Sequence, residues 1–236
     1  MEQNKKNFEI QRELNFLLDM GEKELVLDIG NKPSEPENIE IREEESSPEE
    51  QLAAMESELQ NCTECKLHSS RNKLVFGLGD PQAKIMFIGE APGMNEDKTG
   101  IPFVGRAGKL LDKIFSAMGL SREKGIYIGN ILKCRPPNNR DPESDEVNAC
   151  IPNLIKQIEI IKPEVICCLG RVAAQNLLDT NLALGKMRGK VHYFHETPVM
   201  VTYHPAYLLR NPAGKKPCWE DMKMLLEVAG LPVPKN

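Results

Sequence analysis

The stretch KIMFIG, residues 84–89, is a short, almost continuous apolar run of the kind that forms a strand buried on both faces. Three similar runs follow at residues 126–131 (IYIGNI), 165–170 (VICCLG) and 199–203 (VMVTY). Helical patterns separate these runs at residues 108–118, 145–161 and 171–178. Buried strands that alternate with helices predict an α/β protein, a three-layer α/β/α sandwich with a central four-stranded parallel sheet.

In such a sheet, ligands bind beyond the carboxyl ends of the strands. The segments that follow the four predicted strands should therefore carry the chemistry. They are residues 90–93, 132–137, 171 and 204–210.

The composition and charge of the 236 residues exclude some classes of protein. No stretch approaches the roughly 18 consecutive apolar residues of a membrane-spanning helix, and the N-terminus lacks the apolar core of a signal peptide. We therefore expect a cytoplasmic protein without a membrane partner. Residues 1–60 carry 17 acidic and 6 basic side chains, whereas the rest of the chain carries 18 acidic and 24 basic ones. This asymmetry fits a body that binds a polyanion, although a modest positive charge without function is an open alternative.

Three segments follow from the change in composition along the chain. Residues 1–28 form an N-terminal extension with apolar residues at roughly helical spacing over 8–27, which predicts a short helix. Residues 29–50 are rich in Pro, Ser and Glu and predict an acidic disordered linker. Residues 51–236 form the folded domain. The extension either docks on a replication or repair protein or is an inert tail, and its sequence does not decide between these.

Four of the seven cysteines have a spacing that suits one site. Cys62 and Cys65 form a C-x2-C pair, and Cys134 and Cys150 are separated by fifteen residues. Four thiolates bind either zinc or an iron–sulfur cluster, and spacing alone does not choose between them. Unrelated cysteines are the third reading. Of the others, Cys167 and Cys168 lie in a predicted strand and should be core residues, and Cys218 has no neighbour in the sequence.

Four motifs together resemble the family-four uracil-DNA glycosylases, the iron–sulfur branch of the uracil-DNA glycosylase superfamily. They are CTECKL (62–67), GEAPGMNEDKTGIPFVGRAGKLL (89–111), NILKCRPPNNRDP (130–142) and YHPAYLLR (203–210). The resemblance covers about residues 55–230. It implies a monomeric, monofunctional glycosylase of a prokaryotic nucleoid, which flips uracil out of DNA and hydrolyses the N-glycosidic bond. The product would be an abasic site, the start of base-excision repair.

The resemblance also implies a cofactor and the residues of the uracil pocket. Cys62, Cys65, Cys134 and Cys150 would bind a [4Fe–4S] cluster, for which we expect a structural role because hydrolysis needs no redox step. The backbone of Glu90, Ala91 and Pro92 would edge the pocket. Phe103 would stack on the base, and Asn130 would read its Watson–Crick edge.

The remaining roles concern catalysis, selectivity and DNA binding. His204 would donate to uracil O2 as negative charge develops there. Glu90 is the candidate for positioning water, and Glu96 is the candidate for excluding the methyl group of thymine. Six residues would contact DNA, with Leu208 or Leu209 as a wedge in the base stack: Arg106, Lys109, Tyr207, Leu208, Leu209 and Arg210.

Three other functions are compatible with parts of the sequence. One is a non-catalytic iron–sulfur module that recognises uracil or single-stranded DNA through the same pocket. Another is a relative that bonds covalently to the abasic site, but it carries GEQPG and a basic insertion, whereas this chain reads GEAPG and has no insertion. The third is a zinc-binding nucleic-acid protein.

Overall fold

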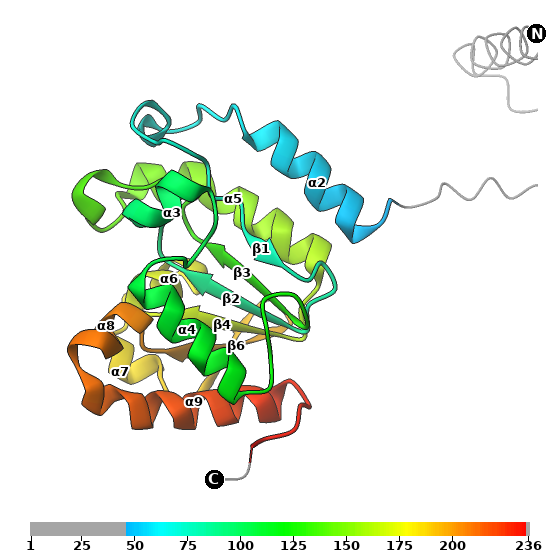
Figure 1. The fold of residues 1–236 in the computed structure, drawn as a ribbon, viewed down its shortest axis with the longest axis vertical. Helices are drawn as coiled ribbons and strands as arrows, with labels where there is room; N and C mark the ends of the chain where they lie inside the picture. The colour runs from blue at the N-terminus through cyan, green and yellow to red at the C-terminus, as the bar shows by residue number, and fades with distance from the viewer. Residues whose placement is uncertain (1–45, 235–236) are drawn as a thin grey trace, which may run out of the picture. The chain divides into compact units, whose positions relative to one another are not determined.

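The computed structural model describes residues 46–234 (Figure 1). The helix predicted over residues 8–27 and most of the predicted linker lie outside these residues. The predicted end of that linker at residue 50 is wrong, because helix α2 spans Pro48–Leu59. Ser47 and Glu50 form a capping box, in which each side chain binds the other residue's backbone N–H. This local signal starts the helix within a stretch whose composition resembles a linker.

The central sheet has six strands in the order β1-β3-β2-β4-β6-β5. Its four inner strands are parallel and confirm the predicted sheet: β2 (Ile85–Gly89), β3 (Ile126–Asn130), β4 (Val165–Leu169) and β6 (Thr197–Thr202). Two antiparallel strands extend it at the edges, β1 (Leu78–Gly79) and β5 (Val191–Phe194). Neither has a long buried run, so neither gave a clear signal in the sequence.

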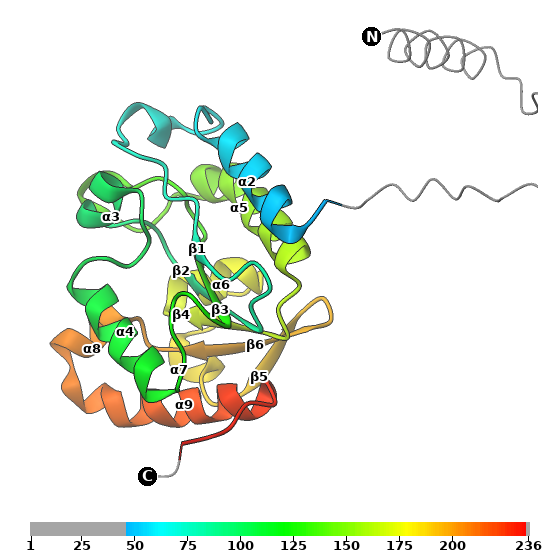
Figure 2. The same ribbon diagram turned by 45° about the vertical axis from the view of Figure 1, so that its right-hand side comes forward.

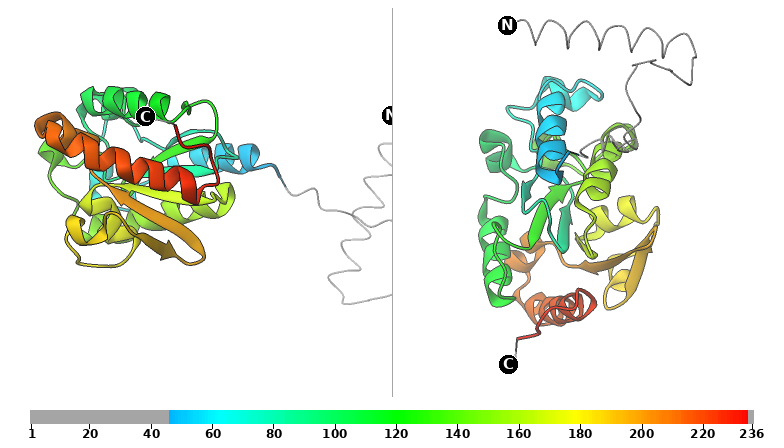
Figure 3. Two further views of the ribbon diagram at one scale, coloured as in Figure 1. Left: turned by 90° about the horizontal axis from the view of Figure 1, so that it is seen from below. Right: turned by 90° about the vertical axis from the view of Figure 1, so that its right-hand side faces the viewer.

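Helices cover both faces of the sheet, which confirms the three-layer architecture. Figure 2 shows α2 beside the long helix α5 (Ser144–Ile161). These two helices share a core with α6 (Arg171–Leu177) and α7 (Leu184–Met187). A second core lies on the other face, against α4 (Arg106–Ala117) and α9 (Lys215–Val228). The two helix layers are seen from other directions in Figure 3.

Alternate residues of each strand enter the two cores, and both are needed to bury the sheet. Cys168 of β4 belongs to the core under α5 and Cys167 to the core under α4, both fully buried as predicted. Short helices connect the main elements: η1 (Lys66–Ser69), α3 (Met94–Thr99), η2 (Pro137–Asn139), α8 (Pro205–Arg210) and η3 (Pro212–Gly214). No helix within residues 46–234 has the length and apolarity needed to cross a membrane.

Candidate active site

A cavity of about 430 Å³ opens beyond the carboxyl ends of β2, β3 and β6. This is the edge at which the sequence predicted a site. All seven residues predicted to bind uracil line the cavity: Glu90, Ala91, Pro92, Glu96, Phe103, Asn130 and His204. Further lining residues have no assigned role in the sequence analysis: Gly93, Ala107, Pro136, Asn139, Arg140 and Ala206.

Asn130 is the last residue of β3, and its side chain is 2% exposed. Of the side-chain nitrogen and oxygen atoms buried within residues 46–234, its Oδ1 alone has no hydrogen-bond partner. A buried acceptor left unpaired costs about 1–3 kcal/mol. Gly89 makes room for it, because a Cβ there would lie 2.3 Å from Oδ1 and 2.6 Å from the Phe103 ring. The wall of the cavity therefore holds an acceptor that only a ligand or water can satisfy.

Phe103 lies on the same wall in a strained backbone conformation. Its φ of 53° is rare for a bulky residue and typical of functional sites. The centre of its ring is 5.7 Å from that of the His204 imidazole, and the planes are tilted by 34°. Its side chain is 7% exposed. One aromatic face and one imidazole thus border the space next to Asn130.

Glu96 holds the loop that carries Phe103. Its Oε1 accepts hydrogen bonds of 2.9 Å from the backbone N–H groups of Val104 and Gly105. A carboxylate fixed by two donors does not swing out of the cavity easily. The predicted role of this group, excluding a methyl group from the base, needs such a rigid wall.

His204 precedes α8 and caps it. Its Nδ1 accepts the backbone N–H of Ala206 at 3.1 Å, so in the neutral ring the proton is on Nε2. Burial and, to a smaller extent, the charge of Arg210 lower the pKa of His204 to about 4, while Glu96 opposes the shift. At neutral pH the ring is therefore an uncharged hydrogen-bond donor through Nε2.

Glu90 follows β2 and is half-buried at the cavity. Burial and, to a smaller extent, the charge of Asp141 raise the pKa of its carboxyl to about 7, while Arg171 opposes the shift. Arg171 and Asp141 also form an ion pair of 2.8 Å. Glu90 is thus a carboxyl group that changes its charge near neutral pH.

The four predicted ligand cysteines line a second cavity together. Arg71 donates to Cys134 Sγ at 3.4 Å and to the Cys62 carbonyl at 2.8 Å. The backbone N–H of Lys133 donates to Cys150 Sγ at 3.3 Å. These donors suit thiolates, since hydrogen bonds to sulfur stabilise its negative charge. Leu59 and Leu74 add apolar surface to this lining.

Within residues 46–234, no three His, Cys, Asp or Glu side chains gather closely enough to hold a single metal ion. Four cysteines around one cavity, two of whose sulfurs accept hydrogen bonds, fit a group that four thiolates bind. Zinc and an iron–sulfur cluster both take this donor set.

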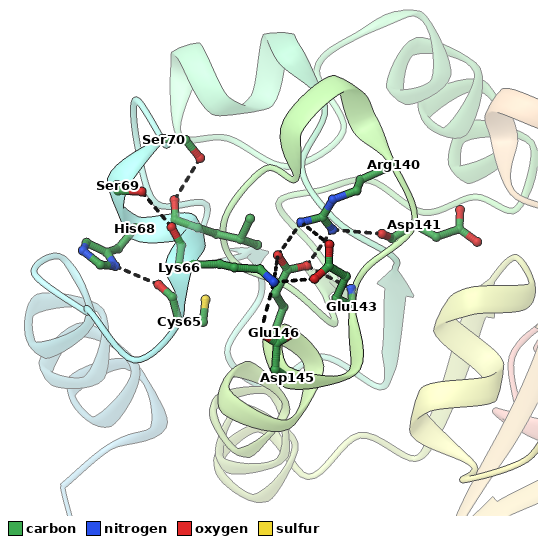
Figure 4. Close-up of polar contacts among 11 residues, drawn as sticks. Cys65, Lys66, His68, Ser69, Ser70, Arg140, Asp141, Glu143, Asp145 and Glu146 are labelled. Carbon is green, nitrogen blue, oxygen red and sulfur yellow. Dashed lines mark hydrogen bonds and ion pairs between the residues drawn. The ribbon is translucent and has the colours of Figure 1, made fainter.

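A network of charges joins the cysteine cavity to the first cavity (Figure 4). Glu146 of α5 is fully buried and accepts two hydrogen bonds from the Arg140 guanidinium, at 2.6 and 2.8 Å. Lys66, the residue after Cys65, lies 3.9 Å from Glu146 and pairs with Glu143 and Asp145. One carboxylate is thus shared between a residue beside a cysteine and a residue that lines the first cavity.

Comparison with known proteins places this geometry in a family. The family description "Uracil DNA glycosylase superfamily" matches residues 76–223. A type-4 uracil-DNA glycosylase of Archaeoglobus fulgidus is 43% identical over 189 residues, which cover 77% of this chain and 94% of the relative. The chain belongs to the type-4 uracil-DNA glycosylases. Type-4 enzymes of Saccharolobus solfataricus and Thermotoga maritima are 47% and 45% identical, and the matches cover 75% and 71% of this chain and 85% and 88% of theirs.

Family membership confirms the resemblance found in the four sequence motifs. In this type-4 chain the six residues predicted to contact DNA differ in their exposure to solvent. Arg106 and Lys109 are exposed on the first turn of α4, and Tyr207, Leu209 and Arg210 are exposed on α8. Helices α4 and α8 pack against each other, so these five side chains come from adjoining elements.

The prediction that Leu208 is available as a wedge is wrong, because its side chain is 1% exposed. The segment is also a helix, not an extended loop, so Leu208 and Leu209 point to different sides of it. Leu208 lies against Gly214, where a Cβ would come within 3.1 Å of its Cδ2. Leu209 is 39% exposed, so the predicted role of a wedge in the base stack remains for Leu209 alone.

The side chains that support α8 were not predicted from the sequence. The Tyr207 ring stacks on Tyr203 at 4.8 Å between centres, and the Arg188 guanidinium lies 3.8 Å from the centre of the Tyr203 ring. Arg188 in turn pairs with the buried Asp221 at 2.6 Å, which also accepts a hydrogen bond from Thr202. The chain positions of these residues gave no signal, since they come together only through the fold.

Proposed function

We propose that the cavity beyond β2, β3 and β6 binds a uracil base turned out of DNA and that the chain hydrolyses its N-glycosidic bond. The chain is a uracil-DNA glycosylase, a hydrolase that acts on N-glycosyl bonds in DNA repair, as its type-4 relatives of high coverage support. This reading is favoured over a non-catalytic binding module. The observation that carries the assignment of the cavity is the unpaired, buried Oδ1 of Asn130.

Asn130 would select uracil by its two hydrogen-bonding atoms. Its Oδ1 would accept the uracil N3–H while its Nδ2 donates to O4. Cytosine presents an acceptor at N3 and a donor at the exocyclic amine, so it would leave both groups of Asn130 unpaired. Phe103 would stack on the extruded base, and the fixed carboxylate of Glu96 would leave no room for the thymine methyl group.

In the reaction, the bond between C1′ and N1 breaks and its electron pair goes to the uracil. The Nε2–H of His204 would donate to O2 and stabilise this anion, as a donor in an oxyanion hole does. Water adds to C1′ and loses a proton, a proton neutralises the uracil anion, and the products are free uracil and an abasic site. Glu90 would orient this water and stabilise the positive charge that develops on the sugar.

Extrusion of the base needs contacts outside the pocket, because a base inside the duplex is out of reach. We assign phosphate contacts to Arg106, Lys109 and Arg210. Tyr207 and Leu209 would fill the space that the extruded base leaves in the base stack.

The four cysteines Cys62, Cys65, Cys134 and Cys150 would hold a [4Fe–4S] cluster. Such a group would supply structure and no electron, since the hydrolysis involves no net redox change. Its place supports this role, because these residues join the segment before β1, the loop after β3 and the start of α5.

Replacing His204 with asparagine is expected to lower the single-turnover rate of uracil excision by about 10²–10³-fold, the usual loss for one donor to a developing anion. Asparagine is a good helix cap, so α8 should form and the melting temperature should change little. Excision is measured by alkaline cleavage of labelled DNA that contains one uracil. A rate that stays within about twofold of the wild type would contradict the role of His204.

The single-turnover rate of uracil excision is also expected to rise with pH through about 7, where Glu90 loses its proton. The Glu90→Gln variant should be slower and should lack this inflection. Asp141→Asn should move the inflection to lower pH and Arg171→Gln should move it to higher pH, because their charges act on Glu90 in these directions. Single-turnover rates measured between about pH 5 and 9 for the wild type and the variants test these predicted inflections. An inflection that persists unchanged in Glu90→Gln would assign it to another group.

A further inference from the structure

Arg122 lies outside the active-site cavity, and neither motif nor spacing assigned it a role. It follows α4 in the turn 121–124, and its side chain is 16% exposed. Its guanidinium is fully engaged: Nη1 donates to the Pro102 carbonyl at 2.7 Å and Nη2 to the Phe103 carbonyl. The third nitrogen, Nε, pairs with Asp112 of α4 at 2.7 Å.

The two carbonyls that Arg122 holds belong to the peptide units on either side of a strained residue. Phe103 has a φ of 53°, and a bulky residue keeps such a conformation only where its surroundings enforce it. A planar guanidinium that binds two successive carbonyls fixes the orientation of both peptide units at once. Arg122 therefore acts on the backbone geometry that aims the Phe103 ring.

Gly108 of α4 also constrains the position of the Phe103 carbonyl. A Cβ on Gly108 would lie 1.6 Å from the Phe103 oxygen, so only glycine lets the helix approach this peptide so closely. Arg122 and Gly108 together enclose one carbonyl. On the other side of the residue, the ring borders the cavity next to His204 and Gly89.

We propose that Arg122 is a positioning residue of the glycosylase: it holds the strained Pro102–Phe103 backbone so that the Phe103 ring is preset for stacking on the extruded uracil. The inference rests on the proposed stacking role of Phe103. A merely structural Arg122 would stabilise the end of α4 through Asp112 without affecting how the cavity binds the base. The two possibilities differ in the effect that replacing Arg122 has on uracil excision when the Phe103 ring is already absent.

The test is a double-mutant cycle with Arg122→Ala, Phe103→Leu and the double variant. Two quantities are measured: the single-turnover rate on uracil-containing duplex, and the inhibition constant of free uracil. We expect Arg122→Ala to lower the rate and weaken uracil inhibition by about tenfold each, within the range of base–aromatic stacking. In the Phe103→Leu background, the same change should cost less than about twofold, because its effect passes through the ring.

Three comparisons separate this effect from lost stability. Affinity for uracil-free duplex should be unchanged in Arg122→Ala, since phosphate contacts lie elsewhere. Ile161→Ala creates a cavity in the core under α5, which does not include Phe103, and should lower the melting temperature while uracil inhibition stays unchanged. Arg122→Lys keeps the charge without the fork, should recover only part of the loss, and takes the place of Arg122→Ala in the cycle if that variant does not fold.

The inference is overturned if Arg122→Ala and Phe103→Leu each reduce the rate and their effects multiply in the double variant. It is also overturned if Phe103→Leu reduces the rate and Arg122→Ala does not, an outcome that leaves the proposed function of the pocket intact. If Phe103→Leu excises uracil at the wild-type rate, the stacking role itself is wrong and the inference falls with it.

Discussion

Replacing Asn130 with alanine is expected to lower the single-turnover rate of uracil excision by about 10³-fold without loss of stability. The rate falls because the base loses two hydrogen bonds, each equivalent to about 1–3 kcal/mol. Stability does not fall because the substitution removes the unpaired buried acceptor. The melting temperature should be unchanged or raised. Excision assays and thermal unfolding of the same preparation measure both quantities.

The matched variant is Asn130→Asp, which keeps the shape of the side chain and replaces its donor with an acceptor. It should be as impaired as alanine and, unlike alanine, should be destabilised, because it buries a carboxylate in a site built for an amide. A large loss of stability in Asn130→Ala would show that the side chain supports the fold. In that case its unpaired oxygen would not be explained by a ligand.

Replacing Cys134 with alanine is expected to lower the melting temperature by roughly 10 °C and to abolish the visible absorbance of the anaerobically purified protein. Structural metal groups contribute folding free energy directly, and a loss of about 4 kcal/mol shifts the melting temperature of a chain of this size by about 2–4 °C per kcal/mol. Cys134 is 6% exposed, so no other ligand from solvent replaces it easily. The measurements are absorbance near 400 nm, iron content and thermal unfolding.

Cys168→Ala is the control for this prediction. It removes a fully buried thiol from β4, outside the cysteine cavity, and should leave absorbance and iron content unchanged. Iron content that is equal in Cys134→Ala and the wild type would remove Cys134 from the ligand set. Zinc in place of iron in the wild type would instead support a zinc site, which the spacing of the cysteines also allows.

The inner strands could be predicted because their signals are local, and the residues of the candidate pocket because four motifs of the sequence resemble those of a known family. Each inner strand is a run of buried residues, and Glu90, Asn130 and His204 each follow or end such a strand. The edge strands β1 and β5 escaped prediction because they are short or half-exposed. Their pairing is decided by the neighbouring strand and not by their own composition.

Other features depend on contacts between distant residues and leave no trace in the pattern. The backbone of Phe103, with its positive φ, is contacted by Arg122, nineteen residues away, and is closely approached by Gly108. The burial of Leu208 depends on η3 and Gly214, which fold back on α8. The motif suggested two equivalent leucines, and only the tertiary packing separates them.

We expect the carboxylate of Glu146, which pairs with both Lys66 and Arg140, to couple the cysteine site to the proposed base pocket. A group that orders the segment of Lys66 would then also favour Arg140 at the cavity, and by reciprocity a base held in the pocket would favour the ordered cysteine segment by the same factor. Oxidative damage at the cysteines would then appear first as weaker retention of the base. Substrate DNA would, in the same way, protect the cysteines from the oxidant.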